Sequence, residues 1–214
     1  MITLHIEAPY GSFRKSFARS FAETYPLPPP ATVYGLLLSL VGERFRHRHV
    51  GVRLAFAYKR LPEIATTLRK LSRYKYGVPT KQSKLGNAPD FVETLCGIEL
   101  LCWVDSTHET QSSPHLETRL IQAIQEPDTV DRYGLLCLGL SDDAVNDVSL
   151  YPKIEGTWRR LLPRPEGSIE LPVWVDHVGS AKTRWNRYLL EDDPKEIASS
   201  PGEFGWEWTT ISLP

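Results

Sequence analysis

The pattern of apolar and polar residues predicts four strands along the first two thirds of the chain. Residues 2–6 alternate apolar and polar side chains, which is the period of a half-buried strand, and residues 52–58 repeat the alternation. Residues 98–105 form a dense apolar run that suits a central strand, and residues 135–140 complete the set. We therefore expect a sheet whose members are widely separated in the sequence.

Two segments show the helical period instead. Pro28, Pro29 and Pro30 fix the backbone for a helix start, and the apolar residues from Val33 to Val41 then fall at i, i+3, i+4, i+7 and i+8. Gly42 predicts the end of this helix. A second helix is expected after Ser113–Pro114, with its apolar inner face between residues 116 and 124.

The order strand, helix, strand, then strand, helix, strand predicts an α+β fold of the ferredoxin-like or RRM type. Such a sheet leaves one face free of helices, and RNA-binding proteins often use that face. We expect this domain to cover residues 1–145, with residues 60–96 as an insertion between its second and third strands. Residues 146–214 are rich in Pro, Trp and acids, and predict a small C-terminal extension with little regular structure.

Length and cysteine usage predict an ordinary cytoplasmic protein. None of the 214 residues belongs to an apolar run long enough to cross a membrane, and the N-terminus lacks the features of a signal peptide. The three cysteines form no close-spaced motif, so reduced thiols are expected. Cys96, Cys102 and His108 lack the spacing of zinc ligands. We expect neither a metal site nor a cofactor.

The distribution of charge points to a binding function, because the net charge of -1 conceals two parts of the chain with opposite net charges. Residues 1–90 hold 15 Lys and Arg against 5 Asp and Glu, whereas residues 91–214 hold 10 against 21. Such asymmetry indicates a polyanion on one side and a different neighbour on the other. The alternative is an uneven surface charge without any polyanionic partner.

The positive charge is concentrated in two segments. One is the loop before the first helix, and the other is the inserted segment, where tyrosines interleave with the cations. Cations for phosphates and aromatic faces for bases are the two ingredients of single-strand binding. The candidate RNA-binding residues on this ground are Arg14, Lys15, Arg19, Arg69, Arg73, Tyr74, Lys75, Tyr76, Lys81 and Lys84. The alternative is an exposed hairpin kept soluble by its lysines.

Catalytic motifs are few. The chain has no Gly-x-Ser-x-Gly, no His-Glu-x-x-His and no phosphate-binding loop. A metal-independent ribonuclease needs only a general base and a cation for the developing charge. Tyr25, His47, His49 and Lys59 offer these groups, although nothing in their spacing selects them.

Two segments of the N-terminal region resemble a known family. Residues 4–14, Leu-His-Ile-Glu-Ala-Pro-Tyr-Gly-Ser-Phe-Arg, and residues 25–37, Tyr-Pro-Leu-Pro-Pro-Pro-Ala-Thr-Val-Tyr-Gly-Leu-Leu, look like the start of the fifth CRISPR-associated (Cas) protein family of the RAMP superfamily. The resemblance is greatest to the variety found in Myxococcus-type and cyanobacterial type I systems. It implies an RRM-like RAMP domain with a protruding β-hairpin thumb, where the basic insertion lies.

The resemblance also implies a role and partners. The subunit would cap the 5′ handle of the guide RNA in a Cascade complex, beside the large subunit and the first backbone RAMP subunit. Phe13 and Arg14 would lie by the handle, Tyr25 would line the turn beside it, and the segment from Lys59 and Arg60 to Lys84 would supply the thumb contacts. Target DNA would be met indirectly, through the complex, and transposition proteins would be further partners if the complex guides a transposon.

One branch of that family cleaves precursor RNA with Tyr, Lys and His, the last two adjacent. This chain has no Lys-His pair. The resemblance therefore favours a non-catalytic binder of guide RNA, with a metal-independent endoribonuclease that processes repeat RNA as the alternative. A module that binds only protein, through its basic face, is a third possibility.

Overall fold

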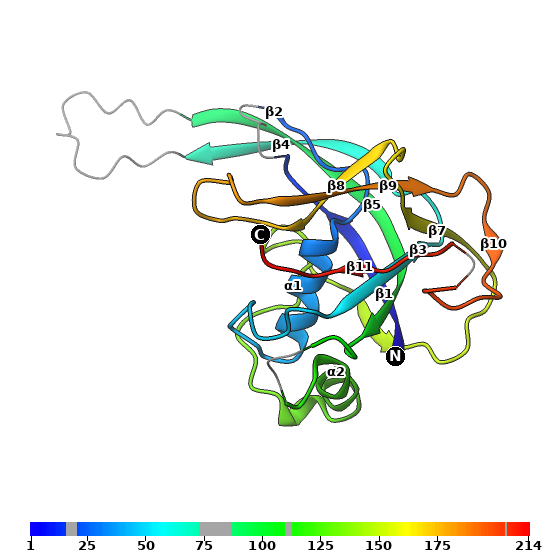
Figure 1. The fold of residues 1–214 in the computed structure, drawn as a ribbon. Helices are drawn as coiled ribbons and strands as arrows, with labels where there is room; N and C mark the ends of the chain where they lie inside the picture. Colours follow the sequence, from blue (N-terminus) through cyan, green and yellow to red (C-terminus); the bar gives the residue numbers. More distant parts are fainter. Residues whose placement is uncertain (16–20, 73–86, 110–112, 204) are drawn as a thin grey trace.

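The computed structural model describes residues 1–15, 21–72, 87–109, 113–203 and 205–214, and these form one mostly antiparallel sheet with two α-helices (Figure 1). The predicted α+β class is confirmed. Within the described residues, no helix is both long and apolar enough to cross a bilayer.

Four antiparallel strands form the centre of the sheet, in the order β6-β1-β5-β3. They are β1 (Ile2–Gly11), β3 (Arg53–Tyr58), β5 (Asn87–Asp105) and β6 (Asp147–Leu150). Leu4 lies opposite Cys102 and Leu54 opposite Val104, so apolar residues of neighbouring strands share one face. The two helices pack on that face: α1 (Pro30–Leu40), and α2 (Leu116–Gln125), which leads into the 3-10 turn η1 (Pro127–Thr129).

The first helix ends as the sequence predicts. Its last residue is Leu40, and Gly42 follows with a φ of 66°, in the left-handed region that glycine enters without strain. A Cβ at Gly42 would lie 2.4 Å from the carbonyl oxygen of Asp131. The turn after α1 and the segment after α2 therefore meet at a position that requires glycine.

The predicted fourth strand over residues 135–140 is wrong. That segment contributes only an isolated bridge between Cys137 and Ala144, and β6 takes the place beside β1. Gly134 and Gly139 both have positive φ values, 79° and 121°, which lie outside the extended region of a regular strand. An apolar run between two such glycines turns instead of pairing.

The expectation of an irregular C-terminal extension is also corrected. Three strands there continue the sheet beyond β3 in the order β7-β9-β8, and two short ones pair with β7 and β3. They are β7 (Thr157–Pro163), β8 (Ile169–Trp174), β9 (Arg184–Leu190), β10 (Lys195–Glu196) and β11 (Thr209–Thr210). The predicted division at residue 145 therefore runs through one continuous sheet.

The face opposite the helices is not free, because C-terminal residues cover much of it. Ala55, Ala57, Leu101 and Trp103 point to this face and pack with Trp158 and Trp206 into a second core. The rings of Trp103 and Trp206 meet edge to face at 4.6 Å, a favoured arrangement for two aromatic side chains. RNA cannot reach this part of the sheet as it does in an open RRM.

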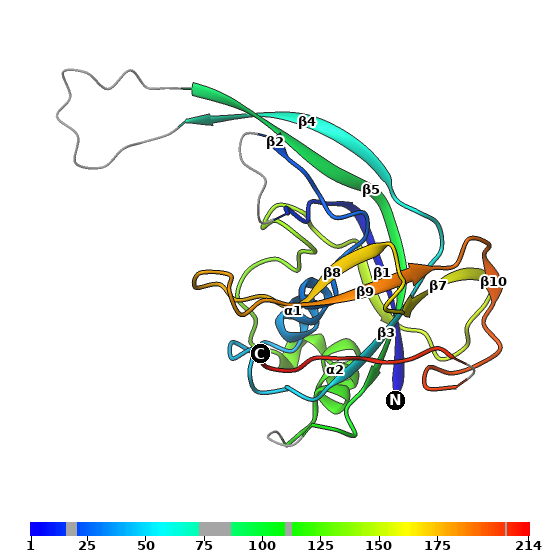
Figure 2. The same ribbon diagram turned by 45° about the horizontal axis from the view of Figure 1, so that its top comes forward.

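The insertion at residues 60–96 is a β-hairpin that projects from the body (Figures 1 and 2). Its strands are β4 (Glu63–Ser72) and the first half of β5, paired from Glu63 opposite Cys96 to Ser72 opposite Asn87. β5 continues from the hairpin into the central sheet through Gly97, whose φ of 70° is a local departure from the extended strand, so the hairpin is an extension of the core strand.

An ion pair between Arg160 and Glu191 holds the C-terminal strands, and its contribution to stability should depend on pH. Arg160 on β7 donates to both carboxylate oxygens of Glu191, at 2.6 and 3.0 Å. Burial raises the pKa of Glu191, but the hydrogen bonds and charge of Arg160 outweigh burial and hold that pKa below its ordinary value.

We expect Glu191→Gln to lower the free energy of unfolding by about 2 kcal/mol at pH 7, the usual contribution of charge-assisted hydrogen bonds. A carboxyl whose pKa is depressed by folding stabilises above its unfolded pKa, about 4.3 for Glu, and loses this effect as pH falls through the lower folded pKa. Urea unfolding of both proteins from pH 7 to pH 3 should therefore show the difference shrinking in acid. The exposed Glu166→Gln is the control; a difference that did not depend on pH would contradict the assignment.

Candidate nucleic-acid interface

The loop between β1 and α1 packs along the root of the hairpin. Its short strand β2 (Phe21–Ala22) pairs in parallel with β5, which places Phe21 beside Phe91. The Thr24 backbone N–H donates to the Glu93 carboxylate at 3.0 Å, and the hydroxyls of Ser12 and Thr94 lie 2.9 Å apart. The loop before α1 and the root of the hairpin therefore form one wall.

The backbone around Arg14 is fixed from both sides. The Phe13 N–H donates to the Thr24 hydroxyl at 2.9 Å, and the Tyr25 N–H donates to the Phe13 carbonyl at 2.9 Å. On the other side, the buried Asp143 carboxylate accepts the Ser12 N–H at 2.8 Å. These bonds hold the start of the loop in one shape, so the position of Arg14 is set by the fold.

Phe13 and Tyr25 do not lie at the surface. Their side chains are only 4% and 8% exposed, and Tyr25 packs against the ring of Trp185 with centroids 6.0 Å apart. Neither ring offers a face on which a base could stack, and their predicted place beside the RNA handle stays a prediction. Both anchor the loop that carries Arg14.

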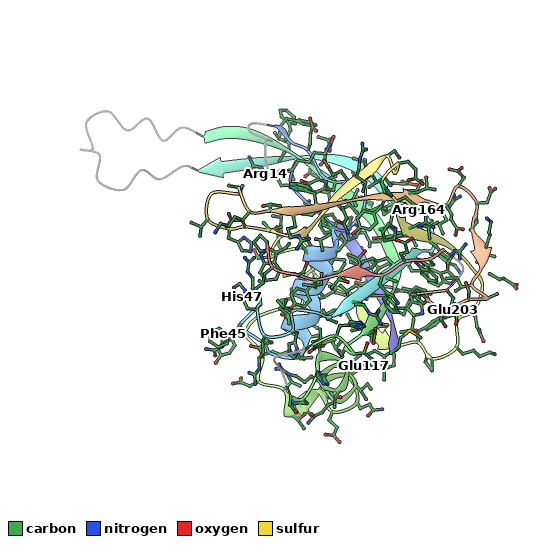
Figure 3. The ribbon with its side chains drawn as sticks, in the orientation of Figure 1. Arg14, Phe45, His47, Glu117, Arg164 and Glu203 are labelled. Atoms are coloured by element: carbon green, nitrogen blue, oxygen red, sulfur yellow. The ribbon has the colours of Figure 1, made fainter. Side chains whose placement is uncertain are left out.

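The cations that precede α1 differ in their surroundings. Arg14 is exposed and lies on the side of the molecule from which the hairpin leaves (Figure 3). Lys15 is half-buried and pairs with Glu23 at 3.1 Å. Arg19 lies outside the described residues.

At the base of the hairpin, Lys59 and Arg60 are held against different neighbours. The Lys59 ammonium lies 4.7 Å from the centre of the Trp158 ring, a cation–π contact on the face opposite the helices. Arg60 is exposed and its guanidinium lies over Gly97 on β5, where a Cβ would come within 2.6 Å. Of the two, Arg60 is the one whose side chain faces solvent.

Most of the predicted thumb contacts remain predictions. Arg69 is in β4, with its backbone opposite Asp90. The residues that lie outside the described part of the chain are Arg73, Tyr74, Lys75, Tyr76, Lys81 and Lys84.

The described part of the hairpin presents apolar side chains that the sequence prediction missed. Phe21 and Phe91 are 40% and 45% exposed, with their rings 6.5 Å apart, and Leu68 lies opposite Phe91 with 64% of its surface exposed. On a strand that belonged to a closed core, these positions would be interior. They are exposed because the hairpin extends beyond the helices, and the signal that could have revealed them is an apolar alternation on both sides of a basic insertion.

The four residues considered for a ribonuclease have different neighbours. Tyr25 lies beside Trp185, Lys59 beside Trp158, and His47 beside Trp174 with ring centroids 5.2 Å apart. In Figure 3, His47 lies in the loop beyond α1, well away from Arg14.

His49 is a structural residue. It is completely buried, with Nδ1 2.7 Å from the Glu109 carboxylate and Nε2 2.8 Å from the Arg119 guanidinium. Because arginine can only donate, Nε2 accepts and the proton of the ring is on Nδ1, bonded to Glu109. Both nitrogens are thus engaged, so His49 is not accessible as a general base.

Comparison with known proteins places this geometry in a family. The family model described as "CRISPR-associated protein (Cas_Cas5)" matches residues 1–113. A protein of Myxococcus xanthus (strain DK1622), named CRISPR-associated protein Cas5, is 41% identical over 194 residues, which are 90% of this chain and 91% of that protein. The chain belongs to the Cas5 family of CRISPR-associated proteins.

Solved structures show the same fold at low identity. A chain described as "CRISPR RNA-guided surveillance complex" aligns with a TM-score of 0.60 and 12% identity, over 96% of this chain and 95% of that one. A second, described as "Crystal structure of Cas protein", aligns at 0.49 and 15% identity over 89% and 93%, too distant to bear on the Cas5 fold. The family model and the Myxococcus relative confirm the resemblance of residues 4–14 and 25–37 to this family.

The contrast between Phe13 and Phe91 can be tested by stability. We expect Phe13→Ala to cost about 3–5 kcal/mol, the range for a buried phenylalanine, because a cavity opens in the core. Phe91→Ala should cost less than about 1 kcal/mol, since its ring is half exposed. Chemical denaturation measures both, and equal losses would contradict the placement of Phe91 on an exposed ribbon.

Proposed function

We propose that this chain is a non-catalytic RNA-binding subunit of a type I Cascade complex, and that it holds the 5′ handle of the guide RNA. The observation that carries this proposal is the wall formed by the loop before α1 and the root of the hairpin. There an exposed arginine, Arg14, belongs to the same small region as the exposed rings of Phe21 and Phe91. A cation with aromatic faces suits a single strand of RNA, whose phosphates and bases both need partners.

The order of the central strands supports the finer description of the fold. β6-β1-β5-β3, with α1 between β1 and β3 and α2 between β5 and β6, is the order of a ferredoxin-like RAMP domain. The hairpin interrupts this unit between β3 and β5 and corresponds to the thumb. RNA would follow the wall at its root, because Trp158 and Trp206 cover the sheet face that an RRM normally offers.

Partner contacts follow from the distribution of charge. Residues 91–214 carry a net negative charge, most of it in residues 91–156, before β7. An acidic surface disfavours RNA, so we assign it to protein neighbours, namely the large subunit and the first backbone RAMP subunit of the complex. Target DNA would be contacted through the assembled complex, in the cytoplasm.

RNA affinity and its salt dependence should distinguish a phosphate contact made by Arg14 from base stacking on Phe91. Arg14→Ala should lower the slope of log K against log salt by about 0.7, the contribution of one phosphate contact to a single strand. Phe91→Ala should leave that slope unchanged and weaken binding by about 1–3 kcal/mol, the loss of one stacked base. Fluorescence anisotropy with a guide carrying its 5′ handle, over a range of salt concentrations, measures both.

Arg164→Ala is the matched control for the arginine, because Arg164 pairs with Glu207 at 2.9 Å on the C-terminal side of the sheet (Figure 3). Arg164→Ala should change neither the salt slope nor the affinity for RNA. If a guide with a scrambled leader bound as tightly as one with the native handle, the specific role would be excluded. If Arg14→Ala and Arg164→Ala behaved alike, the wall would not be the RNA site.

The non-catalytic assignment has its own test. The purified protein, incubated in EDTA with end-labelled repeat RNA, should leave the RNA intact, because both ring nitrogens of His49 are engaged by Glu109 and Arg119. Discrete cleavage that disappeared in His47→Ala would instead establish the alternative, a metal-independent repeat-processing endoribonuclease.

A further inference from the structure

Three possible metal ligands converge on the sheet face opposite the helices. His5 and Glu7 are two residues apart on β1, so their side chains share that face, while Leu4 and Ile6 point into the helix-covered core. Glu99 on β5 lies directly opposite Glu7. The pairing of β1 with β5 therefore builds the cluster, which no local sequence motif encodes.

The atoms are close to the spacing that one ion requires. The Nε2 atom of His5 lies 3.3 Å from a Glu99 carboxylate oxygen and 3.9 Å from one of Glu7, and all three ligand atoms lie within 4.8 Å of one another. Tetrahedral Zn²⁺ with bonds of about 2.0–2.2 Å places its ligands roughly 3.3–3.6 Å apart. The His5–Glu99 distance already lies in this range, and the His5–Glu7 distance exceeds it by a few tenths of an ångström.

The two glutamates point to a cation independently of these distances. Like charges directly opposite each other on neighbouring strands are destabilising. Among the described residues, His5 is the only basic group within 4 Å of either carboxylate. Lys59 lies on the Trp158 ring and Arg60 over Gly97. A bound divalent cation would remove the repulsion that the register imposes.

Aromatic neighbours hold the His5 ring in place, as suits a metal ligand. Its ring stacks on Tyr151 with centroids 5.3 Å apart and meets the edge of Trp158 at 6.0 Å. Packing of this kind orients the first ligand and lowers the entropy lost on binding. The side chains of His5, Glu7 and Glu99 are 14%, 45% and 33% exposed, so an ion can enter from solvent. A shallow hollow lined by Glu7, Arg60 and Glu99 provides the approach.

We propose that His5, Glu7 and Glu99 bind one divalent transition-metal ion, with Zn²⁺ the best fit, and that this ion ties β1 to β5 where the hairpin begins. One imidazole nitrogen and two carboxylate oxygens are ligands that Zn²⁺ accepts, with water completing the shell. Mg²⁺ and Ca²⁺ prefer sites made of oxygen alone and should bind far more weakly. The role is structural, because the ion joins two strands of the central sheet.

Titration calorimetry on the full-length protein, first stripped with EDTA and desalted, tests the site with ZnCl₂ and MgCl₂ separately. We expect one Zn²⁺ per chain and no comparable Mg²⁺ binding. His5→Asn, Glu7→Gln and Glu99→Gln should each weaken Zn²⁺ binding at least about 10-fold, the scale of losing a supporting interaction at a metal. The control is His177→Asn, an exposed histidine beside Asp176, which should bind as the wild type does.

Thermal unfolding gives a second readout that separates metal loss from misfolding. With Zn²⁺ at about 100 times its Kd, the wild-type midpoint should rise by roughly 5–10 °C. In EDTA, Glu7→Gln should melt no lower than the wild type, because it removes the repulsion between the carboxylates; in Zn²⁺ it should show no comparable rise.

Zn²⁺ binding that persisted in the three ligand variants, that was lost in His177→Asn, or that did not occur at all would overturn the proposal. A fall in the melting midpoint of metal-free Glu7→Gln would also overturn it, because the glutamate would then be satisfied without an ion. If Arg60 were the true counter-ion, Arg60→Ala would lower the metal-free midpoint and Zn²⁺ would not restore it.

Discussion

The antiparallel pairing of β1 with β5 is the interaction on which the rest of the structure depends. It runs from Ile2 opposite Val104 to Gly11 opposite Leu95, and it fixes which residues face the helices and which face the C-terminal tryptophans. A shift of one residue would exchange the two faces, because side chains alternate along a strand. The same ladder sets the origin of the hairpin, since β5 passes directly from the centre of the sheet into it.

Much of the central sheet could be predicted because each of its elements has a recognisable pattern in its own segment of the sequence. The alternation at residues 2–6, the stripe of α1 and the basic insertion each carry their own signal, and each corresponds to a real element. The prediction of a strand at 135–140 was wrong because it relied on the apolar residues of that run. The positive φ values of two glycines there interrupt a strand. The C-terminal strands escaped detection for a different reason: Trp158 and Trp206 find their partners on β3 and β5, more than 50 residues away in sequence.

The candidate site was predictable in its charge but not in its exposure. The basic residues of the loop could be read directly, whereas the depth of Phe13 and Tyr25 could not, because an aromatic residue beside an arginine looks the same in a core and at a surface. The opposite error concerns Phe21 and Phe91, which resemble interior residues but lie where the hairpin has no helix behind it. Contacts that depend on the register between two strands are the hardest to predict. Nothing near Glu99 in the sequence indicates that it lies opposite Glu7.

Because β5 belongs to both the sheet and the hairpin, the length of this arm can change only in certain steps. Residues 63 to 72 and 87 to 96 are paired one to one, and the pairing of β2 at Phe91 and Val92 supports the root of this ribbon. Adding two residues to each strand would lengthen the arm by roughly 7 Å and keep every side chain on its original face, whereas adding one would reverse all those beyond the insertion. The reach of the arm can therefore change in steps of residue pairs, while the sheet that supports it stays unchanged.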